Sequence, residues 1–216
     1  VERPSGKLVW LHAVGLGEVL ALRGLILELH KKEGNLNFLV TSSTVLSAEV
    51  FEKNCPPKTI HQFLPYDVKI YSKRFLRHWK PDLVIWSEQD VWPGLSCQAS
   101  NFGIKQVLVN GKIRKESFSR RIKIKPLHRV VYKNFEFIST QDFSSRSFYQ
   151  KLGASCIIRT DGSLKPHCPP LVFDEKDLKI IKRAISNKSV WVVGSSFLED
   201  EKIAIYTQKL LVERNV

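Results

Sequence analysis

The sequence predicts an α/β protein whose Rossmann-like parallel sheet is covered by helices on both faces. Short apolar runs, typical of buried strands, recur along most of the chain. Amphipathic segments with helical spacing separate most of these runs. Strands that alternate with helices in this way form a parallel sheet with right-handed crossovers.

The first strand, turn and helix form the most distinct unit. The apolar run 7–11 leads through His12 and two glycines into a helical pattern from about Gly17 to His30. Glu18 then lies in the first helical turn, at the carboxyl end of the first strand, where open α/β sheets bind ligands. The helix macrodipole also favours an acid there, so a purely structural Glu18 is the alternative. We interpret His12, inside an apolar strand, as a hydrogen-bonded core histidine.

The remaining elements follow in a regular order. Further strands are expected at residues 36–41, 59–64, 82–86, 104–110, 135–140 and 156–160. Helices are expected at residues 45–53, 68–79, 94–102, 126–132 and 143–152. Gly103 and Gly153 stand where helices should end, and Pro81 prevents the helix before it from continuing.

The pattern changes after Lys165. Residues 1–165 are expected to form the first domain, and residues 166–188 a proline-rich linker followed by a helix at 174–186. A strand at 189–194 and a helix at 198–214 would open a second domain within residues 189–216, with the remainder missing. The chain contains no methionine. We therefore expect that residue 1 is not a translation start and that an N-terminal segment, such as an anchor, precedes it.

Charge is the clearest compositional signal. The formal net charge is +13, and residues 101–160 alone carry +10. The segment 112–133 holds nine cationic residues and one acid, Glu116. Such a block indicates an anionic partner, meaning phosphates, acidic lipid or nucleic acid, with a solvated helix face as the alternative. The four scattered cysteines predict reduced thiols rather than a zinc site, and no apolar run reaches membrane-spanning length.

Five short segments occur together in a specific order and spacing. They are HAVGLGE (12–18), LPYD (64–67), WSEQDVWP (86–93), VNGKIRKES (109–117) and DGSLK (161–165). In this combination the chain resembles the bacterial 3-deoxy-D-manno-octulosonic acid (Kdo) transferases that glycosylate lipid A precursor. The resemblance runs from about Arg3 to the end of the chain. It implies the acceptor-binding N-terminal half of a two-domain, double-Rossmann (GT-B) glycosyltransferase.

The resemblance also implies roles for individual residues. Glu18 would be the general base, while Glu88 and Lys165 would stabilise the transition state of an inverting transfer. CMP-Kdo would be the donor substrate, with no cofactor and no metal. Glu88 and Asp90 could alternatively form a carboxylate pair that holds a divalent metal. Acceptor or membrane binding is expected at Asp90, Lys112, Arg114, Ser117, Arg120, Arg121, Lys123 and Lys125.

The expected partners are a lipid A precursor and the anionic membrane surface at the cytoplasmic face of the bacterial inner membrane, reached peripherally or through an N-terminal anchor. Phe197 stands where the family has a histidine, and the donor-binding motifs would lie beyond residue 216, so this chain alone should not turn over. The alternatives are a GT-B transferase of other specificity, an inactive homologue, or a nucleic-acid-binding module. The last is disfavoured because only Phe118 and Tyr132 interleave the basic block.

Overall fold

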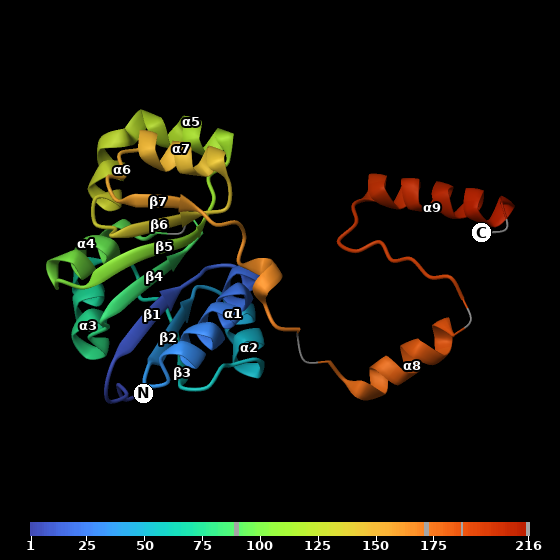
Figure 1. Cartoon of the computed structure of the whole chain (residues 1–216), viewed down its shortest axis with the longest axis horizontal. Helices are drawn as coiled ribbons and strands as arrows, with labels where there is room; N and C mark the ends of the chain where they lie inside the picture. The colour runs from blue at the N-terminus through green and yellow to red at the C-terminus, as the bar shows by residue number, and fades with distance from the viewer. Residues whose placement is uncertain (89–90, 171–172, 187, 215–216) are drawn as a thin grey trace. The chain divides into compact units, whose positions relative to one another are not determined.

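A computed structural model describes residues 1–88, 91–170, 173–186 and 188–214. The chain divides into two units, residues 1–171 and 172–216. The first unit contains a seven-stranded sheet in the order β3-β2-β1-β4-β5-β6-β7, and every pairing is parallel (Figure 1). The strands are β1 (Leu8–His12), β2 (Asn37–Ser42), β3 (Thr59–Phe63), β4 (Leu83–Ser87), β5 (Lys105–Gly111), β6 (Phe137–Thr140) and β7 (Ile157–Thr160). The predicted fold class is confirmed.

Helices cover both faces of this sheet because the central strands are apolar on both sides. On one face, Val9 and Leu11 of β1 pack with Val19, Leu22 and Ile26 of the first helix. That layer holds α1 (Leu16–Lys32) and α2 (Val45–Lys53). The opposite layer holds α3 (Lys69–Trp79), α4 (Pro93–Asn101), α6 (Lys125–Tyr132) and α7 (Phe143–Lys151).

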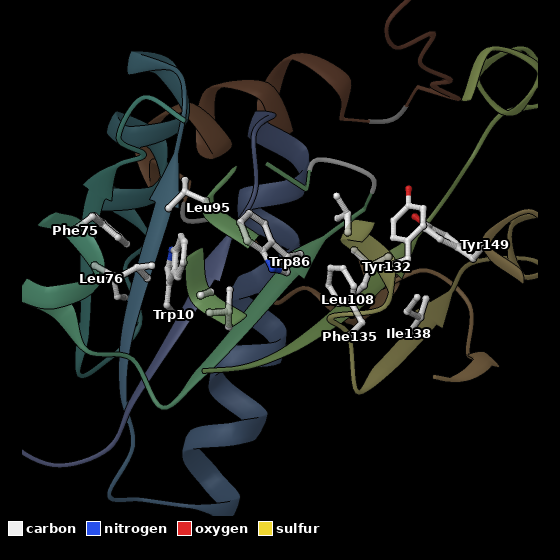
Figure 2. Packing of buried hydrophobic residues seen from close by; sticks show 14 of the residues in the cluster. Trp10, Phe75, Leu76, Trp86, Leu95, Leu108, Tyr132, Phe135, Ile138 and Tyr149 are labelled. Atoms are coloured by element: carbon white, nitrogen blue, oxygen red, sulfur yellow. The ribbon is translucent and has the colours of Figure 1, made fainter. Parts of the chain in front are cut away.

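The second layer has the more aromatic core. Trp10 and Trp86 lie on neighbouring strands with ring centroids 5.4 Å apart, and Phe75 of α3 packs against Trp10 (Figure 2). The buried indole nitrogens of Trp10 and Trp86 each donate a hydrogen bond, to Thr41 and Gln106. Trp86 is therefore a core residue.

Helix ends follow the local chemistry. Gly103 and Gly153 adopt φ values of 71° and 100°, which confirms the two glycines as helix terminators. One helix was not predicted, α5 (Lys115–Arg121), which continues into the 3₁₀ turn η1 (Ile122–Ile124). Its sequence has no apolar periodicity, and for this reason the helix was missed. Its one aromatic residue, Phe118, stacks on Phe148 of the core with ring centroids 4.2 Å apart.

The second unit contains α8 (Glu175–Ile185) and α9 (Leu198–Glu213), close to their predicted bounds. The prediction of a strand at residues 189–194 is wrong, since these residues form no strand. A strand exists only through hydrogen bonds to a neighbour, and the described residues of this unit contain only helices and irregular backbone. The first unit also extends past the expected boundary at residue 165, because the 3₁₀ turn η2 (Lys165–His167) packs against α1.

Candidate active site

A cleft lies at the carboxyl edge of the sheet, where the strand order reverses between β1 and β4. Such a switch point is where open α/β sheets bind ligands. The cleft has a volume of about 510 Å³. It is lined by Glu18, Glu88, Lys112, Arg114, Glu116, Ser117 and Arg120.

Glu18 is held by the turn that precedes its own helix. Its Oε2 accepts hydrogen bonds from the backbone N–H groups of Val14 and Gly15, each at 3.2 Å. Among the described residues, none donates a hydrogen bond to Oε1. Glu18 therefore stabilises the helix start and also presents a carboxylate oxygen to the cleft. The structural and the functional interpretations are compatible.

Glu88 is held by residues far away in sequence. It follows β4 in the left-handed region, with φ of 58°, which costs a non-glycine residue on the order of 1 kcal/mol. Its backbone is fixed because its N–H donates to the Val109 carbonyl at 3.0 Å and the Tyr149 hydroxyl donates to its carbonyl at 3.2 Å. Its side chain is only 15% exposed.

Lys165 reaches this edge from the outermost strand. The segment after β7 returns toward α1, where Cys168 contacts the Leu20 carbonyl through its thiol. Lys165 Nζ lies 3.9 Å from Glu88 Oε1. The lysine side chain is 60% exposed, so the pair contributes at most about 1 kcal/mol to stability. The structure thus brings together the three residues predicted to be catalytic. Their roles remain predictions.

The predicted basic residues divide into two groups. Lys112, Arg114, Ser117 and Arg120 line the cleft. Ile113 between them is buried, with 3% of its surface exposed, while its charged neighbours Lys112 and Arg114 are exposed. The other members lie elsewhere.

Arg121 donates to the Tyr132 hydroxyl at 3.2 Å and is not among the residues that line the cleft. Lys123 lies exposed in η1 and is likewise not a lining residue. Lys125 lines a different pocket with Arg129 and Lys133. The predicted basic group is therefore not one site, because α5 and α6 place its two halves apart. Asp90 lies outside the described residues.

Three residues of this region were given no role from the sequence. Asp67 accepts hydrogen bonds from the N–H groups of Gly94 and Leu95, at 2.9 and 2.6 Å, and so caps α4 from a distant loop. Glu116 adds a third carboxylate to the cleft. Asn110 connects Glu88 to the segment that carries Lys165. All three lie within the five short segments described above, but only their contacts in the fold show what they do.

His12 is a core residue, as expected. Its Nδ1 lies 2.9 Å from Thr41 Oγ1, and its Nε2 accepts a hydrogen bond from Trp92 at 3.0 Å. An accepting Nε2 places the proton on Nδ1, so the ring is neutral. Burial lowers its pKa from 6.5 to about 4. His12 therefore fixes the Trp92 loop beside β1 rather than transferring protons.

Solved structures share this fold. A UDP-N-acetylglucosamine 2-epimerase from Rickettsia bellii superposes with a TM-score of 0.54 at 15% identity, covering 84% of this chain and 49% of that one. The enzyme from Neisseria meningitidis, solved with UDP-GlcNAc, gives 0.51 at 13% identity, covering 84% and 51%. At these identities the likeness shows the fold alone. The sheet and its edge cleft define the first unit as a Rossmann-like α/β domain.

Sequence comparison identifies the family. Residues 1–167 match the family described as 3-deoxy-D-manno-octulosonic-acid transferase (kdotransferase), and the chain belongs to it. It is 33% identical over 199 residues to the 3-deoxy-D-manno-octulosonic acid transferase of Rickettsia prowazekii, covering 92% of this chain and 43% of the relative. It is 30% identical over 217 residues to a probable mitochondrial one of Arabidopsis thaliana, covering 98% and 48%. The chain thus spans less than half of each relative.

Proposed function

We propose that this chain is the acceptor-binding half of an inverting glycosyltransferase that moves Kdo from CMP-Kdo to a lipid A precursor. The observation that carries the proposal is that Glu18 and Glu88 line one cleft at the edge of the sheet, with Lys165 3.9 Å from Glu88 and three cations also lining the cleft. Membership of the Kdo transferase family supports Kdo as the sugar that is transferred. CMP-Kdo would enter from the donor half of the full-length protein.

Each group has a distinct part in the transfer. The acceptor hydroxyl attacks the anomeric carbon of Kdo and gives its proton to the open oxygen of Glu18, while the bond from that carbon to the CMP phosphate breaks. A positioned carboxylate base contributes typically about 10²–10⁴-fold. Glu88 would stabilise the positive charge that develops on the sugar ring. Lys165 would neutralise the departing phosphate or the Kdo carboxylate.

The cleft cations suit an acceptor with phosphates. Lys112 and Arg114, before α5, and Arg120, in its last turn, line the cleft. Guanidinium groups bind phosphate through paired hydrogen bonds. An apolar groove of about 490 Å³ lies on the same sheet edge, after β2 and β3, and suits acyl chains. Its apolar lining consists of Val45, Phe63, Leu64, Pro65, Tyr66 and Trp92.

The predicted basic residues outside the cleft would dock the protein on an anionic membrane. Lys123 and Lys125 stand beside exposed Ile122, Ile124 and Leu127. Apolar contact combined with about 1 kcal/mol per cation is how interfacial segments bind anionic lipid. No helix among the described residues is long and apolar enough to cross a membrane. Changing Lys123 and Lys125 to glutamate should weaken sedimentation with anionic vesicles, whereas Lys7→Glu should not.

The direct test supplies full-length protein with CMP-Kdo and a tetra-acylated, bisphosphorylated glucosamine disaccharide. We expect the acceptor mass to rise by whole Kdo residues and the KM for a dephosphorylated acceptor to be higher. Transfer from another nucleotide sugar but not from CMP-Kdo would contradict the proposed donor. Absence of transfer from every donor would favour an inactive homologue.

A further inference from the structure

Asn110 lies near the end of β5, between Glu88 and the segment that carries Lys165. The residue is 1% exposed, and its side chain makes two hydrogen bonds. Its Nδ2 donates to Glu88 Oε1 at 3.2 Å, and its Oδ1 accepts from the Leu164 N–H at 3.0 Å. A backbone N–H can only donate, so Oδ1 must face Leu164 and the amide N–H₂ must face Glu88.

We propose that Asn110 is a positioning residue that holds Glu88 and the Lys165 segment in register for sugar transfer. This inference rests on the proposed function. The short amide donates to the carboxylate of Glu88, and it also fixes the backbone one residue before Lys165. The ion pair of 3.9 Å between Glu88 and an exposed lysine is too weak to do this alone.

The backbone of Asn110 is itself constrained. Its φ of 57° lies in the left-handed region, which asparagine tolerates better than most residues. The pairing of β5 with β6 is irregular between Leu108 and Gly111, so Asn110 lies where the strand departs from its register. The Gln141 side chain donates to the Asn110 carbonyl at 3.1 Å and keeps this conformation in place. Strained backbone held by its surroundings is typical of functional sites.

An amide is the side chain that meets all these requirements. It accepts one hydrogen bond and donates another without carrying charge. Aspartate would keep the shape and the bond from Leu164, but it would set a second carboxylate against Glu88. Glycine would keep the backbone conformation and lose both bonds. These two substitutions therefore separate the side chain's chemistry from its backbone conformation.

The experiment measures kcat, KM and melting temperature of full-length Asn110→Gly and Asn110→Asp. Loss of a hydrogen bond to a charged group predicts that kcat for Asn110→Gly falls by roughly 10- to 100-fold. The KM should change little because the cleft cations remain. The control is Lys80→Gly, which also replaces a left-handed residue (φ 41°) but lies at the opposite edge of the sheet. Its rate should equal that of the wild type.

The pH profile separates positioning from mere folding. In Asn110→Asp the new carboxylate faces Glu88, and Lys165, 3.9 Å from Glu88, offsets only part of the added negative charge. Repulsion between the two carboxylates should therefore move the acid limb of kcat/KM to higher pH. Asn110→Gly adds no titrating group but removes the N–H donor to the Glu88 carboxylate, so its limb should move in the same direction by less. A purely structural Asn110 would lower the melting temperature of both variants and leave both limbs unmoved, which overturns the proposal.

A second outcome also overturns it, namely a kcat for Asn110→Gly within about twofold of the wild type. Failure of the proposed function looks different. In that case the wild type transfers no Kdo, or Glu18→Gln retains the full rate, whatever happens at position 110.

Discussion

Glu18 and Glu88 line the same cleft but are held in opposite ways. Glu18 is fixed within four residues of itself, by the N–H groups of Val14 and Gly15. Glu88 is fixed by Asn110, Tyr149 and Lys165, each from another part of the chain. The first carboxylate needs only a strand, a turn and a helix. The second needs contacts from β5, α7 and η2, so its geometry is the more vulnerable to changes elsewhere in the fold.

The largest expected effect separates the two carboxylates by activity and stability together. Glutamine at the third helical position can still accept the backbone hydrogen bonds, so Glu18→Gln should leave the melting temperature nearly unchanged while kcat falls by about 10²–10⁴-fold. Glu88→Gln should also lower kcat, and it should lower the melting temperature more because a half-buried network is disturbed. Kinetics and thermal unfolding of the full-length protein measure both. Glu33→Gln, on the exposed end of α1, is the control.

Equal losses of melting temperature in the two glutamine variants would contradict the distinction between local and remote support. Full activity of Glu18→Gln would remove the general base from the mechanism.

The same distinction explains what the sequence could predict. The parallel sheet, its cover of helices on both faces and the position of Glu18 follow from local periodicity and from the rule for ligand sites in open sheets. The link through Asn110 and the cap from Asp67 depend on contacts between distant segments, which no local pattern encodes. The helix α5 was missed because it has one aromatic anchor instead of an apolar face.

A second prediction concerns the core beneath the Glu18 turn. His12 has its pKa lowered from 6.5 to about 4 in the folded state, so between these pH values the unfolded chain binds the extra proton. Stability should therefore fall as the pH drops from about 6.5 to 4, by up to about 3 kcal/mol from this group. Denaturant unfolding across that range measures it. In His12→Gln this part of the pH dependence should disappear, and an unchanged slope would show that other groups cause it.

The smallest expected effect tests whether Lys165 depends on remote support as Glu88 does. A Cβ added to Gly24 of α1 would clash with the carbonyl oxygen of His167, so Gly24→Ala must shift the Lys165 segment relative to α1. Overpacking of this kind costs about 1–3 kcal/mol. We expect a lower melting temperature and reduced kcat, with the Glu18 turn intact. Gly34→Ala adds the same methyl group in open space and should change neither. Wild-type kcat in Gly24→Ala would show that Lys165 reaches the site without its anchor on α1.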